Sequence, residues 1–167
     1  MNCNAADPQG PPSAAGRVLV IGYGNTLRGD DAFGPLVAER VRRVADPRRV
    51  DVRACHQLTP EFAADIAACD HVIFIDATIA APAGQLDCRE LACKDAATNA
   101  VLHSVGPEQL LALAFLVYGR APSATLVCVG GLCFDVGDQQ LSAPVAAAVP
   151  SAVARIQDLL AGRLAGN

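Results

Sequence analysis

The chain has 167 residues, of which 52% are hydrophobic and 18% are charged, enough for the core of one ordinary domain. Aromatic residues make up only 4% and the formal net charge is −4, which argues against a nucleic-acid partner, because such binding relies on basic surfaces and aromatic stacking. Residues 1–16 lack the positive start and apolar stretch of a secretory signal, and no apolar run is long enough to span a membrane. We therefore expect a flexible leader over residues 1–16, a single domain over residues 17–167, no membrane partner and a cytoplasmic location.

Strands and helices are expected to alternate along the chain. Short β-branched or apolar runs predict strands at 17–23, 51–54, 71–75 and 124–129, with a further strand at the sheet edge over 84–91. Helices are predicted over 33–44, from Thr59-Pro60-Glu61 onward, over 106–118 and over 143–164, where Pro150 should kink or divide the last helix. This alternation predicts a three-layer α/β fold, in which an open, mostly parallel sheet is covered by helices on both faces.

Seven cysteines raise the question of a metal site or a thiol nucleophile. The pairs Cys88/Cys93 and Cys128/Cys133 share a C-x4-C spacing, which is longer than in the usual zinc knuckle and lacks a flanking histidine. We interpret these cysteines as reduced, small hydrophobic residues of the core.

The loop after the first strand combines glycines with an asparagine and paired acids. Gly22 and Gly24 allow the backbone to turn sharply, and Asn25 can hold the loop by side-chain hydrogen bonds. Asp30 and Asp31 stand just before a helix, where one of them is expected to cap it. The second acid is then free to act as a ligand.

Two further polar residues are expected at the same rim of the sheet. Asp76 follows a buried strand directly, and His103 precedes the helix that starts near residue 106. Ligands of open α/β sheets bind at the carboxyl ends of the strands. Asp31, Asp76 and His103 would together form a mixed oxygen and nitrogen metal shell that suits zinc or nickel better than calcium.

At these residues the sequence resembles the hydrogenase maturation endopeptidase family. The family's opening motif, roughly G-x-G-N-x-L-x-x-D-[DE]-x-x-G after a strand, is matched by Gly22, Gly24, Asn25, Leu27, Asp30, Asp31 and Gly34. Its D-A pair after the third strand is matched by Asp76-Ala77, and its metal-binding histidine by His103, although the sequence around His103 departs from the commoner pattern. The resemblance covers residues 17 to 160 in one collinear run.

The resemblance implies a fold, an activity and a partner. The fold would be a twisted, mostly parallel five-stranded sheet with helices on both sides. The protein would be an endopeptidase that recognises nickel already installed in the large-subunit precursor of a [NiFe]-hydrogenase and removes its C-terminal extension. Nickel would be carried by the substrate and need not be retained by the enzyme.

Asp31, Asp76 and His103 would line the nickel-recognising cleft. We take Asp31 or Asp76 as the general base that activates water, and we expect Asp30 to cap the helix and support Asp31. The absence of a coiled-coil pattern favours a monomer.

Three other functions are compatible with parts of the sequence. A nucleotide-binding module of Rossmann type would use Gly22 and Gly24, but the third glycine of its motif is replaced by Leu27. A peptidyl-tRNA hydrolase would share the G-x-G-N loop, but it needs a histidine soon after that loop and a basic surface. A self-contained zinc hydrolase would hold its metal permanently.

Overall fold

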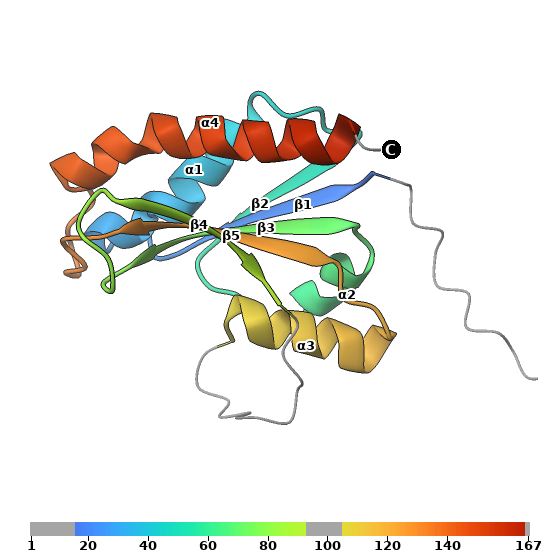
Figure 1. Cartoon of the computed structure of the whole chain (residues 1–167). Helices are drawn as coiled ribbons and strands as arrows, with labels where there is room; N and C mark the ends of the chain where they lie inside the picture. Colours follow the sequence, from blue (N-terminus) through green and yellow to red (C-terminus); the bar gives the residue numbers. More distant parts are fainter. Residues whose placement is uncertain (1–15, 93–104, 166–167) are drawn as a thin grey trace, which may run out of the picture.

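The computed structural model describes residues 16–92 and 105–165. Its elements, in chain order, are β1 (Val18–Tyr23), the 3-10 helix η1 (Gly29–Ala32), α1 (Phe33–Arg42), β2 (Val50–Cys55), α2 (Phe62–Ala67), β3 (His71–Thr78), β4 (Leu86–Leu91), α3 (Pro107–Tyr118), β5 (Ser123–Gly130) and α4 (Ala143–Ala165). The strands form one sheet in the order β2-β1-β3-β5-β4, in which only β4 runs antiparallel to its neighbour (Figure 1). The predicted mostly parallel sheet, with residues 84–91 at its edge, is confirmed.

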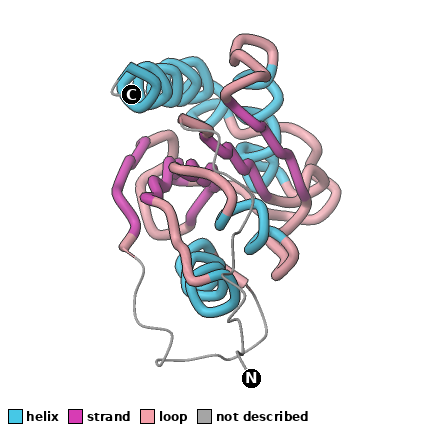
Figure 2. Tube along the Cα trace, turned by 90° about the vertical axis from the view of Figure 1, so that its right-hand side faces the viewer, coloured by secondary structure: helices cyan, strands magenta, loops and turns pink. Residues whose placement is uncertain are grey.

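Helices cover both faces of this sheet, as the views in Figures 1 and 2 show. On one face, α1 and α4 pack on alternate strand residues such as Val20, Ile73 and Val127. On the other face, α2 and α3 pack on the intervening residues, among them Ile21 and Phe74. Because β1, β3 and β5 in the middle of the sheet are buried on both sides over most of their length, their sequences are largely apolar, whereas the edge strands β2 and β4 include charged residues that are not buried.

The last helix is continuous through Pro150, so of the two predicted effects of this proline, a kink or a division, the division is wrong and the kink stays a prediction. A proline inside a helix leaves the carbonyl four residues earlier without its usual donor. Here both Pro150 and Ala146 are exposed, so water can solvate the carbonyl of Ala146. α2 also begins later than its opening residues indicate, because Thr59, Pro60 and Glu61 form a turn before Phe62.

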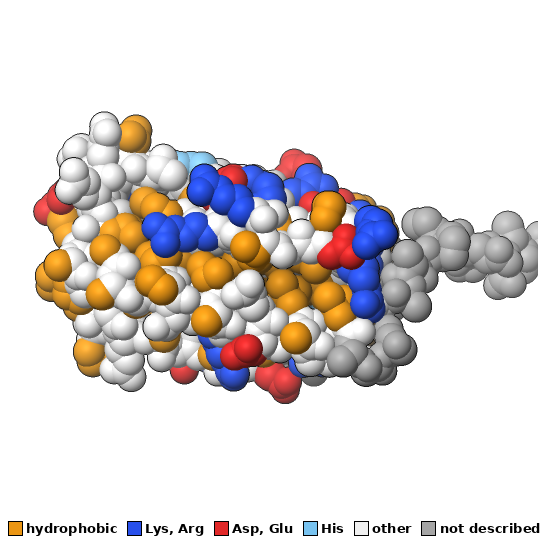
Figure 3. Space-filling view, turned by 90° about the horizontal axis from the view of Figure 1, so that it is seen from above, with side chains coloured by type: hydrophobic (Ala, Val, Ile, Leu, Met, Phe, Trp, Pro, Cys, Tyr) orange, Lys and Arg blue, Asp and Glu red, His pale blue; other side chains and the backbone are white. Residues whose placement is uncertain are grey.

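The surface on the α4 side carries basic side chains along one edge and hydrophobic side chains over its centre (Figure 3). Acidic side chains are interspersed with the basic ones. Ion pairs join Arg42 to Glu39, and Arg48 to Asp46 at 3.1 Å. Within the described part of the chain, none of the helices is both long and apolar enough to cross a bilayer.

Candidate active site

Asp76 lies in the carboxyl-terminal half of β3, on the face of the sheet that α2 and α3 cover. Its backbone pairs with Cys128 of β5, and the preceding residue, Ile75, pairs with Gly22 of β1. Its Oδ2 accepts a hydrogen bond of 2.7 Å from the Tyr23 hydroxyl, and its Oδ1 accepts one of 2.8 Å from the Ala77 N–H. The side chain is thus held at the rim where ligands of open α/β sheets bind.

The surroundings of Asp76 raise the pKa of its carboxyl above the ordinary value. Burial raises the pKa of the Asp76 carboxyl and the nearby charge of Asp31 raises it further, against the opposing effect of the bonds from Tyr23 and Ala77. Burial and the negative charge of Asp76 likewise raise the pKa of the Tyr23 phenol far above its ordinary value. The hydroxyl therefore remains a hydrogen-bond donor at neutral pH.

Asp31 belongs to η1, and its charge acts directly on Asp76. Its Oδ2 accepts the backbone N–H of Asn25 at 2.8 Å, and the Asn25 side chain in turn accepts the N–H of Leu27 at 2.9 Å. Asn25 thus closes its own turn and anchors Asp31 at the same time. Although the two acids are far apart in the sequence, the charge of Asp31 contributes to the raised pKa of Asp76.

The glycines of this loop let η1 and α1 approach the strand ends very closely. Gly24 has φ +142°, and a Cβ at this position would stand 1.9 Å from the Asp31 carbonyl oxygen. A Cβ at Gly22 would stand 2.1 Å from the carbonyl oxygen of Gly34. Side chains at these positions would push Asp31 away from the rim.

Asp30 does not cap a helix, so the capping prediction is wrong. Neither η1 nor α1 has a side-chain hydrogen bond at its N-cap. Instead, the completely buried Asp30 carboxylate binds the loop between β5 and α4. Its Oδ2 accepts the N–H groups of Leu132 and Cys133 at 2.7 and 2.9 Å and the Ser142 hydroxyl at 2.8 Å, while Oδ1 accepts the Ser142 N–H at 2.7 Å. A buried charge needs such donors, and this loop provides four of them.

Burial alone would raise the pKa of Asp30, but these hydrogen bonds outweigh burial and hold the pKa below its usual value. Asp30 therefore stays ionised and ties the β5–α4 loop to the loop that carries Asp31.

His103 lies outside the described residues. Among the residues that are described, no group of three histidine, cysteine, aspartate or glutamate side chains is placed to hold a metal ion. The structure thus brings Asp31 and Asp76 to one rim, and the expected third ligand stays a prediction.

Tyr23 is a residue of the site that the sequence reasoning missed. It occupies the variable position of the G-x-G-N motif, so the motif itself does not single it out. The available signal was its place at the end of β1 beside the end of β3, because adjacent parallel strands bring their carboxyl ends together.

The cysteines of the described region are free thiols. Burial raises the pKa of Cys69 to about 11 and that of Cys128 to about 12. Neither is an activated nucleophile, because a reactive cysteine needs a lowered pKa. Cys88 and Cys133 are half-buried, and Cys93 lies outside the described residues.

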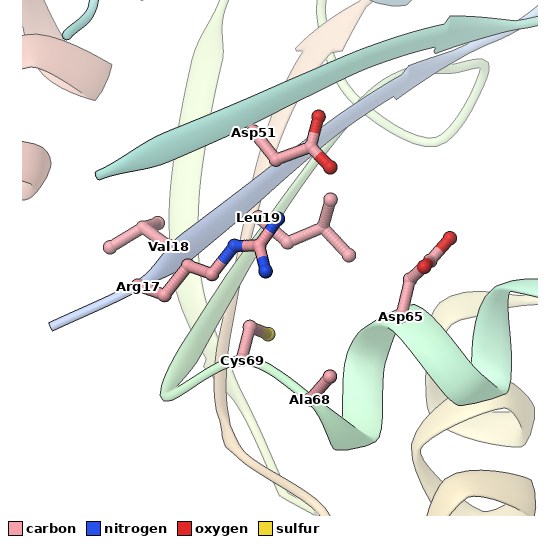
Figure 4. A pocket seen from close by; sticks show the side chains of 7 residues that line it. All are labelled: Arg17, Val18, Leu19, Asp51, Asp65, Ala68 and Cys69. Carbon is pink, nitrogen blue, oxygen red and sulfur yellow. The ribbon is translucent and has the colours of Figure 1, made fainter. Parts of the chain in front are cut away.

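The hollow in Figure 4 lies at the opposite end of the sheet. It is lined by Arg17, Asp51, Asp65 and Cys69, among others, near the amino ends of β1 and β2. Its volume of about 30 Å³ leaves room for only a few water molecules. His71, at the amino end of β3, also lies at the end of the sheet opposite Asp31 and Asp76. Burial lowers the pKa of its imidazole to about 4.

Several solved structures with the same fold are hydrogenase maturation proteases. The crystal structure of a hydrogenase 2 maturation peptidase from a Thaumarchaeota archaeon is 31% identical, with a TM-score of 0.66 over 87% of this chain and 98% of that chain. The hydrogenase maturating endopeptidase HybD from E. coli is 25% identical, with a TM-score of 0.69 over 87% of this chain and 93% of that chain.

A [NiFe] hydrogenase maturation protease, HycI from Thermococcus kodakarensis, covers 91% of this chain and 94% of its own at 24% identity, with a TM-score of 0.68. At 24% identity, this likeness is evidence for the fold alone. No protein-family model matches the sequence, and no curated protein sequence matches it either.

The fold and the likeness to a 31% identical maturation peptidase thus define a class of α/β peptidases. The chain belongs to the hydrogenase maturation endopeptidase family, and it is a protease. The nucleotide-binding and peptidyl-tRNA hydrolase alternatives are thereby set aside.

Proposed function

We propose that this endopeptidase removes a C-terminal extension from the large-subunit precursor of a [NiFe]-hydrogenase after nickel has been installed there. The observation that carries the proposal is the meeting of Asp31 and Asp76 at one rim of the sheet, close enough for one charge to raise the pKa of the other. The description of the Thermococcus kodakarensis relative as a [NiFe] hydrogenase maturation protease supports this kind of precursor.

Asp76 suits the role of general base, because a raised pKa strengthens the affinity of a carboxylate for a proton. A water molecule would attack the scissile carbonyl carbon and lose its proton to Asp76. That proton would then pass to the departing amide nitrogen. Asp31 is the alternative base.

Nickel belongs to the substrate in this scheme. The carboxylates of Asp31 and Asp76 and the imidazole of His103 are the oxygen and nitrogen donors that suit nickel or zinc. They would recognise the metal as it arrives with the precursor. Metal analysis of the purified enzyme distinguishes this scheme from a self-contained zinc hydrolase, for which stoichiometric zinc is expected.

Exposed apolar side chains surround the same rim. They are Leu27, Ile79, Leu132 and Val136, which are 52%, 83%, 67% and 82% exposed. Exposed apolar residues grouped near a site mark surfaces that bind other molecules. We assign this group, the apolar rim, to the polypeptide of the precursor, because an endopeptidase must hold a chain beside its reacting groups. We also propose that the enzyme works as a cytoplasmic monomer, without nucleic-acid or membrane partners.

The test is incubation with a large-subunit precursor, with and without nickel, followed by mass spectrometry. We expect a small C-terminal mass loss that requires nickel. Asp31→Asn, Asp76→Asn and His103→Ala should fold but process at least about 100-fold more slowly, the scale of a lost acid–base group. Asp65→Asn, an exposed acid of α2 at the opposite end of the sheet, should process normally. Normal processing by all three site variants would refute the proposal.

A further inference from the structure

The Tyr23 hydroxyl is directed at the acid to which we assign water activation. Its bond to Asp76 Oδ2 measures 2.7 Å and joins residues 53 positions apart in the sequence. Both side chains are half-buried, and both lie on the face of the sheet covered by α2 and α3. A charge-assisted hydrogen bond of this kind is stronger than a neutral one, and it fixes geometry as well.

Within the described residues, Tyr23 is the one side chain that donates a hydrogen bond to this carboxylate. The remaining donor is the Ala77 N–H, which binds the other oxygen at 2.8 Å. An ionised carboxylate has about four lone-pair sites, so each oxygen of Asp76 keeps one for another partner. The two bonds therefore set the rotation of the carboxylate without using up its capacity.

Packing alone does not explain a tyrosine at this position. A phenylalanine or leucine would fill the same space beside the α2 and α3 core without bringing a hydroxyl. The hydroxyl needs an acceptor once it is half-buried, since an unpaired polar group there is costly. It finds that acceptor in the candidate base, and the backbone register of β1 and β3 places the two strand ends together.

We propose that Tyr23 is a positioning residue of this protease, whose hydroxyl holds the Asp76 carboxylate in the orientation in which its free lone pairs face the substrate. This inference rests on the proposed function of Asp76. Partners that orient a functional carboxylate or ligand from behind change activity by about 10- to 100-fold when they are removed. The orientation of the Asp76 carboxylate affects the reaction step more than substrate binding. Removal of the Tyr23 hydroxyl should therefore lower kcat rather than raise KM.

The test compares Tyr23→Phe with Tyr118→Phe. Tyr118, the other tyrosine of the chain, is 53% exposed at the end of α3 and serves as the matched control. Steady-state processing of the nickel-loaded precursor should show kcat lowered about tenfold in Tyr23→Phe, with KM changed less than about twofold. Tyr118→Phe should keep both constants.

A second measurement separates positioning from support of the fold. In protein labelled with ¹³C at the aspartate carboxyl carbons, Asp76→Asn identifies the Asp76 resonance. Tyr23→Phe should shift this resonance, and Tyr118→Phe should leave it in place. The unfolding midpoint of Tyr23→Phe should fall by only about 2–4 °C, the effect of one lost hydrogen bond in a chain of this size.

The possible outcomes are distinct. Wild-type kinetics for Tyr23→Phe together with an inactive Asp76→Asn would overturn the inference and leave the proposed function standing. Normal processing by both variants would overturn the inference together with the assignment of water activation to Asp76, whereas the proposed function itself falls only if Asp31→Asn and His103→Ala also process normally. A fall in the midpoint of more than about 10 °C, with the loss shared between kcat and KM, would assign Tyr23 to packing and would also overturn the inference.

Discussion

At the scale of single residues, the buried Asp30 carboxylate shows how one side chain can hold two loops together. Its four hydrogen bonds reach residues 102 to 112 positions further along the chain. They hold the β5–α4 loop against the loop that ends at Asp31. In Asp30→Asn, one side-chain oxygen becomes an amide that cannot accept the N–H groups facing it. We expect a loss of about 2–4 kcal/mol in the free energy of unfolding, measured by urea titration.

The pH dependence of this loss follows from the lowered pKa of Asp30. A carboxyl whose pKa falls on folding stabilises the native state above the pKa of the unfolded chain, about 3.9, and this stabilisation disappears as the pH falls through the folded value. The difference in the free energy of unfolding between the wild type and Asp30→Asn should therefore be largest at neutral pH and decrease below about pH 4. Asp158→Asn, an exposed acid of α4, is the control, and an equal loss there would contradict this assignment.

At the scale of elements, the approach of η1 to the end of β1 depends on glycine at position 24. The positive φ and the 1.9 Å approach to the Asp31 carbonyl both exclude a side chain. Gly24→Ala should cost about 2–4 kcal/mol, because strain in φ adds to a backbone clash. Processing should also fall, since Asp31 would move away from Asp76.

The control for this substitution is a glycine-to-alanine change that we expect to stabilise the protein. Gly162 is an exposed residue of α4, and a Cβ there would meet nothing within 4 Å. Gly162→Ala should stabilise the protein by about 0.5–1 kcal/mol, because alanine is the better helix former. Thermal unfolding measures both variants. A neutral Gly24→Ala would show that the loop is free to rearrange.

At the scale of the whole molecule, the two ends of the sheet carry different groups of side chains. Asp31, Asp76 and the apolar rim occupy the end where the parallel strands terminate, and the backbone bonds Gly131 to Thr78 and Gly137 to Leu27 join its loops. Leu132→Ser should raise KM for the precursor about five- to tenfold, the effect of about 1–1.4 kcal/mol of lost apolar contact, and leave kcat unchanged. Kinetics with the purified precursor would test this.

Leu116→Ser provides the comparison for that experiment. Leu116 is 72% exposed in the carboxyl-terminal half of α3, which leads to the start of β5 at the opposite end of the sheet. The KM of Leu116→Ser for the precursor should equal that of the wild type. The same rise in KM in both variants would mean that the precursor does not recognise the apolar rim in particular.

The sequence by itself determined the class of the fold and indicated the loops that carry the candidate site. An apolar run such as His71–Ile75 indicates a strand that is buried on both faces of a sheet. The G-x-G-N loop with its paired acids is likewise recognisable as a motif of neighbouring residues. These are properties of neighbouring residues, so they can be read along the chain.

The hydrogen-bond partners of Asp30 and Tyr23 were decided by the tertiary structure alone. Their partners, Ser142 and Asp76, lie 112 and 53 positions away. Local sequence indicates that an acid before a helix can cap it, but it cannot show that a distant loop offers four donors to that acid. Whether a buried polar group is structural or functional depends on which long-range partner satisfies it, and only the folded chain brings those partners together.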